Sequence, residues 1–90
     1  MVSGDLISKL KQASSYLNNN GRITEASEFE DFAKRLKEVN INRQELEEIK
    51  KSIISRCDIR RLGDIHIKEI ANPYVWWNFL GSIKSLAEKI

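Results

Sequence analysis

The chain has 90 residues, of which 41% are hydrophobic and 31% charged, with a formal net charge of +2. A chain of this length supports one hydrophobic core, so we expect a single domain over residues 1–90. Its hydrophobic residues are spread along the whole sequence, which excludes general disorder, and no apolar run approaches the roughly 18 residues of a membrane span. We therefore expect no membrane partner. The single cysteine, Cys57, excludes an intramolecular disulfide and favours a reducing, cytoplasmic location.

Two helices are expected in the amino-terminal half. Asp5 can cap the first, which should end at the turn-forming run Asn18–Gly21. Thr24 can cap the second, which should end near Val39 or Asn40. Their buried positions follow the 3.6-residue period: Leu6, Leu10, Ala13 and Leu17 in the first helix, and Ala26, Phe29, Phe32, Ala33 and Leu36 in the second.

The third helix has the clearest start signal in the chain. Asn42 stands three residues before Glu45, the spacing of a reciprocal capping box, and Ile41 is placed to pack on Leu46. This helix is expected to bury one stripe, made of Leu46, Ile49, Ile53 and Cys57.

A connector without helical periodicity follows over residues 60–68, where Gly63 interrupts any helix. Three of its side chains are expected to insert into the core: Leu62, Ile65 and Ile67. Asn72 then caps the last helix, and Pro73 occupies its first position, where a missing N–H costs nothing. The pattern predicts an all-α fold, a compact single-domain bundle of about four helices with an irregular connector before the last helix.

The last helix contains two adjacent tryptophans. Because neighbouring helical residues point about 100° apart, Trp76 falls on the apolar stripe with Leu80, whereas Trp77 falls beside Lys84 on the polar flank. We therefore predict that Trp76 is buried. For Trp77 two interpretations stay open: it forms an exposed contact surface with Tyr74, or it covers a groove between helices.

Charge is distributed unevenly along the chain. Residues 24–48 contain eight acids and four bases, whereas residues 50–68 contain six bases and two acids. These segments could steer a charged partner, or they could pair with each other across adjacent helices. We favour the internal pairing.

The sequence offers little for catalysis or metal binding. With one histidine and one cysteine the usual zinc ligand sets cannot be assembled, so we expect no metal site and no cofactor. Cys57, His66 and Asp64 permit a thiol nucleophile with a base and an orienting carboxylate. However, Cys57 falls on the apolar stripe of the third helix, so a buried thiol is the favoured interpretation. We predict no catalytic residue and no enzyme activity.

Nucleic-acid binding is the main alternative to protein binding. The Lys50–Arg61 region gathers five bases within twelve positions: Lys50, Lys51, Arg56, Arg60 and Arg61. The net charge is nevertheless modest, and the helix that follows the first turn is acidic, unlike the reading helix of a helix-turn-helix domain. We rank this alternative second.

Several segments show a general similarity to a known family. These are Leu62–Ile67, Trp76–Leu80, the Asn20-Gly21 end of the first helix and the helix over Ala26–Leu36. Through them the chain resembles small helical immunity proteins encoded beside bacterial toxins. The resemblance implies a cytosolic inhibitor that occludes the active site of a toxin by tight binding and catalyses nothing. Many such inhibitors are acidic, and the net charge of +2 departs from that pattern.

We therefore expect a small protein-binding module of the inhibitor or immunity type, with a nucleic-acid-binding or regulatory protein as the alternative. Two surfaces are candidates for the protein partner. The first is acidic and would mimic phosphate toward a cationic toxin, through Glu28, Asp31, Glu45 and Glu48. The second combines bases and aromatic residues, namely Arg60, Arg61, Tyr74 and Trp77.

Overall fold

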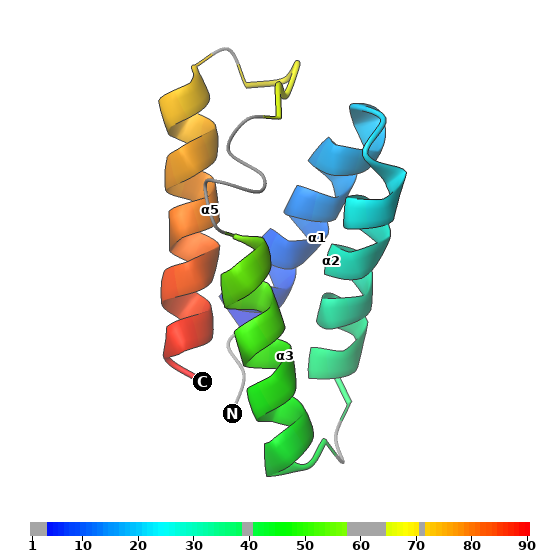
Figure 1. The fold of residues 1–90 in the computed structure, drawn as a ribbon, viewed down its shortest axis with the longest axis vertical. Helices are drawn as coiled ribbons and strands as arrows, with labels where there is room; N and C mark the ends of the chain where they lie inside the picture. The colour runs from blue at the N-terminus through cyan, green and yellow to red at the C-terminus, as the bar shows by residue number, and fades with distance from the viewer. Residues whose placement is uncertain (1–3, 39–40, 58–64, 71) are drawn as a thin grey trace.

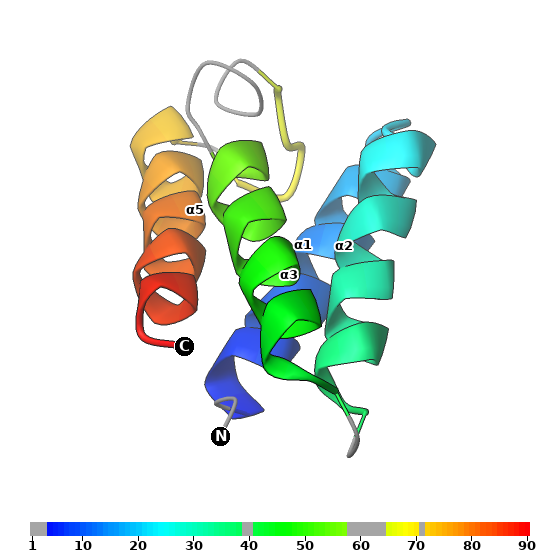
Figure 2. The ribbon, with the colours of Figure 1, turned by 60° about the horizontal axis from the view of Figure 1, so that its bottom comes forward.

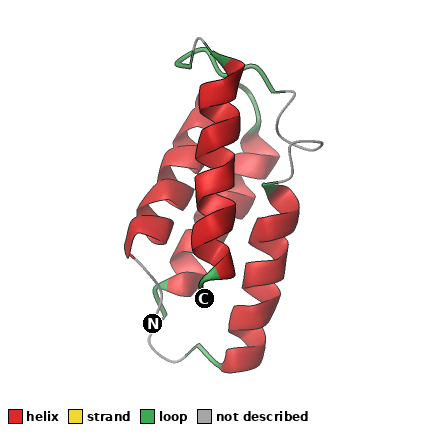
Figure 3. Ribbon diagram, turned by 90° about the vertical axis from the view of Figure 1, so that its left-hand side faces the viewer, coloured by secondary structure: helices red, strands yellow, loops and turns green. Residues whose placement is uncertain are grey.

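The computed structural model describes residues 4–38, 41–57, 65–70 and 72–90. In these ranges the chain forms α1 (Gly4–Asn19), α2 (Ile23–Leu36), α3 (Arg43–Arg56) and α5 (Pro73–Glu88), and no strand (Figure 3). Successive helices run in opposite directions, and the start of α1 and the end of α5 lie at the same end of the bundle (Figure 1). The predicted all-α bundle of about four helices is confirmed, and residues 65–70 of the predicted connector are not helical.

One hydrophobic core fills the space between the helices. The predicted stripes supply it, and its largest fully buried side chains are Trp76, Phe29, Leu6, Leu10, Leu17, Ile49, Ile53, Leu80 and Ile83. Leu46 differs from the expectation because it is only partly buried. It lies in the first turn of α3, where fewer neighbouring helices cover a side chain than in the middle of the bundle.

α1 ends in a Schellman turn, which confirms the predicted helix end. Gly21 adopts φ 79°, the Arg22 N–H donates to the Leu17 carbonyl at 2.8 Å, and the Gly21 N–H donates to the Asn18 carbonyl at 3.3 Å. Arg22, the residue after this glycine, is the N-cap of α2. Its side chain makes no capping hydrogen bond. The prediction that Thr24 caps this helix is therefore wrong, because α2 has already begun at Ile23.

The two asparagine caps are confirmed. The Asn42 side chain accepts a hydrogen bond from the Glu45 N–H at 2.7 Å, and the Asn72 side chain accepts one from the Tyr74 N–H at 2.9 Å. Pro73 opens α5 at the position expected for it. Both helices therefore begin at residues that the sequence specifies locally.

The predicted start of α1 and the predicted end of α2 also differ from the structure. α1 begins at Gly4, so Asp5 lies in its first turn instead of capping it, where its charge still favours the helix dipole. α2 ends at Leu36 with Lys37 as its C-cap. The predicted end near Val39 or Asn40 lies outside the described residues.

Asn20, in the turn after α1, holds the described part of the connector. Its side-chain oxygen accepts a hydrogen bond from the Lys68 N–H at 3.0 Å. Ile67 is buried in the core and Ile65 packs against it, as predicted. Leu62, the third expected anchor, lies outside the described residues.

Candidate protein-binding surfaces

The amino-terminal part of α5 carries an apolar surface, called here the α5 aromatic surface and made of Tyr74, Val75 and Trp77. Tyr74 is 65% exposed and Val75 is 52% exposed. The rings of Tyr74 and Trp77 meet edge to face, with centroids 5.1 Å apart and an interplanar angle of 84°. Trp77 is half-buried because it also packs against the core. Trp77 is thus partly exposed beside Tyr74 and partly covered by the core.

Burial of Trp76 determines this arrangement. As predicted, Trp76 lies in the core, where its ring stacks on Phe79 with centroids 5.8 Å apart and meets Tyr16 of α1 edge to face at 6.3 Å. Because adjacent helical residues point about 100° apart, Trp77 is turned away from the centre of the core. No charged residue occurs between Pro73 and Ile83, so this part of α5 presents only uncharged side chains.

The acidic residues expected to face a partner are mostly paired within the protein. Glu28 of α2 accepts a hydrogen bond from Arg56 of α3. Arg35 of α2 donates to Glu45 of α3 at 3.0 Å and lies 4.0 Å from Asp31. The Glu28–Arg56 pair joins the acidic segment to the basic one across adjacent helices, as favoured from the sequence, whereas Arg35 and its two acids all belong to the acidic segment. These pairs reduce the negative surface that a cationic partner would meet.

Glu45 and Glu48 differ in their surroundings. The hydrogen bond from Arg35 to the Glu45 carboxylate raises the pKa of Arg35. The capping-box bond expected from this carboxylate to Asn42 is not among the hydrogen bonds of the described residues. Glu48 is exposed and forms no ion pair with any described residue. Of the four predicted acids, Glu48 is therefore the one without an ion pair among the described residues.

The basic region is described only in part. Arg60 and Arg61, which belong to the second predicted protein surface and to the nucleic-acid alternative, lie outside the described residues. Arg56 is paired internally. In the described part of the region, Lys50 and Lys51 of α3 remain as bases for an anionic partner.

Cys57 and His66 lie in different environments. Cys57 caps the carboxyl end of α3 and is 3% exposed, and this burial raises the pKa of its thiol to about 12. His66 is exposed on the connector. A nucleophilic cysteine requires an accessible thiolate, which Cys57 does not offer in this conformation. Within the described ranges, no three or more His, Cys, Asp or Glu side chains gather where they could hold a metal ion.

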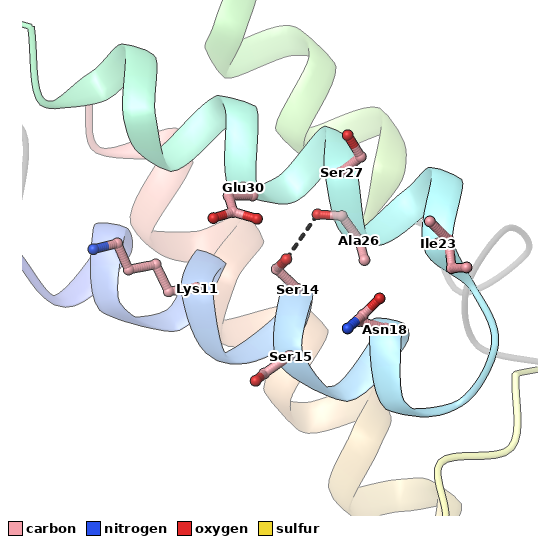
Figure 4. A pocket seen from close by; sticks show the side chains of 8 residues that line it. All are labelled: Lys11, Ser14, Ser15, Asn18, Ile23, Ala26, Ser27 and Glu30. Carbon is pink, nitrogen blue, oxygen red and sulfur yellow. Dashed lines mark hydrogen bonds between the residues drawn. The ribbon is translucent and has the colours of Figure 1, made fainter.

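A groove of about 440 Å³ between α1 and α2 was not anticipated from the sequence (Figure 4). Ser14 and Ala26 are buried at its base, where the Ser14 hydroxyl donates to the Ala26 carbonyl at 2.8 Å. Lys11 and Glu30 contribute opposite charges, and Ile23 is 68% exposed. The other lining residues are Ser15, Asn18 and Ser27. The signal in the sequence was the set of small side chains on both helices, which leaves space between the backbones.

Comparison with protein-family models, with curated proteins and with solved structures gives no match to this chain. The resemblance to immunity proteins therefore depends on the quoted sequence segments alone. None of the described helices combines the length and the apolar character needed to cross a bilayer.

Proposed function

We propose that this protein is a cytoplasmic protein-binding module of the inhibitor or immunity type, and that it binds its partner through the α5 aromatic surface. The observation that carries the proposal is the exposure of Tyr74 and Val75, with the Tyr74 ring in contact with the half-buried Trp77. Exposed apolar side chains are unfavourable in water. A partner that covers them removes this surface from water, and the free energy of that removal favours binding.

The α5 aromatic surface is ordered before any partner arrives. Asn72 and Pro73 start the helix immediately before it, and the Tyr74 ring is supported by Trp77. Binding therefore costs little side-chain entropy at these positions. Tyrosine and tryptophan are also the residues that most often dominate the free energy of binding at protein interfaces.

The inhibitor part of the proposal rests on the family resemblance of Leu62–Ile67 and Trp76–Leu80. An inhibitor that occludes an active site needs a complementary surface and no reactive group of its own. The buried thiol of Cys57 and the ion-paired carboxylates are compatible with such a role. The acidic surface is the weaker candidate because three of its four residues are paired with Arg35 or Arg56.

Co-purification of the tagged protein from its native host, followed by mass spectrometry, would identify the partner. Isothermal titration with the purified partner then tests the surface. Tyr74→Ala should raise Kd by about 30-fold or more, the effect of losing a hot-spot residue worth at least about 2 kcal/mol. The matched control is Ile23→Ala, which removes a comparably exposed apolar side chain from α2 and should leave Kd within about twofold of the wild type.

Two results would contradict the proposal. If Glu48→Lys abolishes binding while Tyr74→Ala does not, the partner uses the acidic surface. If the partner is an active toxin and keeps full activity in a saturated complex, the protein is a binding module but not an inhibitor. Circular dichroism of each variant shows whether the fold is retained.

A further inference from the structure

The bundle consists of two helix pairs that meet along two seams. α1 and α2 form the more extensively packed pair, and α3 and α5 form the other (Figure 2). The pairs meet where α1 lies beside α5 and again where α2 lies beside α3, which we call the α1–α5 seam and the α2–α3 seam. The side chains that join the two seams differ in chemistry.

The α1–α5 seam is aromatic. The ring of Tyr16 meets Trp76 at 6.3 Å and Phe79 at 5.9 Å, both edge to face. The Lys9 ammonium lies 5.3 Å from the centroid of the Phe79 ring. In the turn that follows α1, the Asn20 side chain accepts a hydrogen bond from the Lys68 N–H of the connector. Most of these contacts depend on packing and on ring geometry, so salt affects them little.

The α2–α3 seam is ionic. Because α2 and α3 are antiparallel, the pair Glu28 and Arg56 lies toward one end of the seam and the pair Arg35 and Glu45 toward the other. The four side chains are between 30% and 40% exposed, so water and salt reach both pairs. Partly exposed ion pairs of this kind weaken as ionic strength rises.

Apolar contacts contribute less to holding α3 than they do for its neighbour. α3 buries two of its 14 residues, Ile49 and Ile53, whereas α2, which has the same length, buries five. Apolar burial scales with the area removed from water, so the ion pairs supply a larger share of the attachment for α3 than for α2.

We propose that the α2–α3 seam is an ionic latch that opens as ionic strength rises, with the α1–α5 seam as its hinge. Raising NaCl from about 0.1 M to about 1 M shortens the Debye length from about 10 Å to about 3 Å. The two ion pairs weaken, and the aromatic contacts stay in place. Opening uncovers the apolar sides of α2 and α3 and releases the carboxylates of Glu28 and Glu45 from their arginines.

Alkylation of Cys57 with iodoacetamide measures the opening, because Cys57 is the only thiol, is buried, and directly follows Arg56, which pairs with Glu28 across the α2–α3 seam. The reagent is uncharged, so salt does not change its approach. When reclosing is fast, the rate follows the population of the open state. From about 0.1 M to about 1 M NaCl, the rate for the wild type should rise about two- to tenfold.

Variants test whether the two ion pairs cause the salt dependence of the alkylation rate. Glu28→Gln with Glu45→Gln should label faster at low salt and respond little to added salt. Glu28→Arg with Arg56→Glu keeps an ion pair at the same place and should behave like the wild type. The matched control is Glu48→Gln, which removes a charge from α3 without removing an ion pair and should also keep the wild-type response.

Three results would overturn the latch. The first is a wild-type rate that does not change with NaCl, a measurement that requires no variant to fold. The second is an undiminished salt response in the double glutamine variant. The third is a urea dependence of labelling as steep as that of global unfolding, because the thiol would then be reached through complete unfolding and not through a limited opening.

Discussion

Cys57 should be almost inert toward thiol reagents while the protein is folded. Burial raises the pKa of its thiol from 9.0 to about 12. A change of about three pKa units lowers the thiolate fraction near pH 8 by about 1000-fold. The side chain is also only 3% exposed, so a reagent meets it only when the bundle opens.

The assay compares alkylation of the folded protein with that of the protein unfolded in about 6 M guanidinium chloride, followed by intact mass spectrometry. Near pH 8 and at low salt, we expect the folded protein to react at least about 1000-fold more slowly than the unfolded chain, because thiolate content and access both fall. Since the chain has one cysteine, the site of labelling is unambiguous.

His66→Ala is the control for this reasoning. His66 is exposed on the connector, so its removal should leave the alkylation rate of Cys57 unchanged. The argument from burial would be refuted by a folded-state rate within about tenfold of the unfolded rate. A rate that falls on His66→Ala would indicate a thiol activated by an imidazole, and the enzyme interpretation would return.

Four further predictions concern the free energy of unfolding, measured by urea titration. Ser14→Ala should lower it by about 1 kcal/mol because the Ala26 carbonyl loses its buried hydrogen bond, and an effect as small as that of the exposed control Ser15→Ala would contradict this. Gly21→Ala should lower it by about 1 kcal/mol because an L-residue is strained at φ 79°. Gly81→Ala, inside α5 with nothing within 4 Å of an added Cβ, should instead raise it by about 0.5–1 kcal/mol, and equal signs would refute the conformational explanation. Finally, the pKa of the Cys57 thiol is raised on folding, so the unfolded chain loses this proton at a lower pH than the folded protein does. The free energy of unfolding should therefore decline as pH rises from 9.0 toward about 12. Cys57→Ala should show a shallower decline.

The α5 aromatic surface could be predicted in outline because it lies within one helix. The rotation of about 100° between neighbouring residues separates Trp76 from Trp77, and Asn72 with Pro73 starts the helix. These are local rules that need no knowledge of other helices. How far Trp77 is covered could not be predicted, because that depends on side chains that tertiary packing brings against it.

The ion-pair partners of the acidic residues could not be predicted from local rules. Glu28 and Arg56 are 28 positions apart, and they meet only because α2 and α3 are adjacent and antiparallel. The sequence allowed internal pairing as one of two interpretations, but it did not specify the partners. The groove between α1 and α2 also escaped prediction, since it depends on how closely two backbones approach.

The amino-acid sequence by itself determined the helices, their buried stripes and the asparagine caps of α3 and α5, because hydrophobic periodicity and capping act over a few neighbouring residues. The same local physics placed Gly21 at the end of α1. The tertiary structure alone decided which charges are neutralised, which seam is ionic and which aromatic, and how much of Trp77 stays exposed. These properties depend on the side chains that a second helix brings within a few ångströms, and no spacing along the chain encodes that distance.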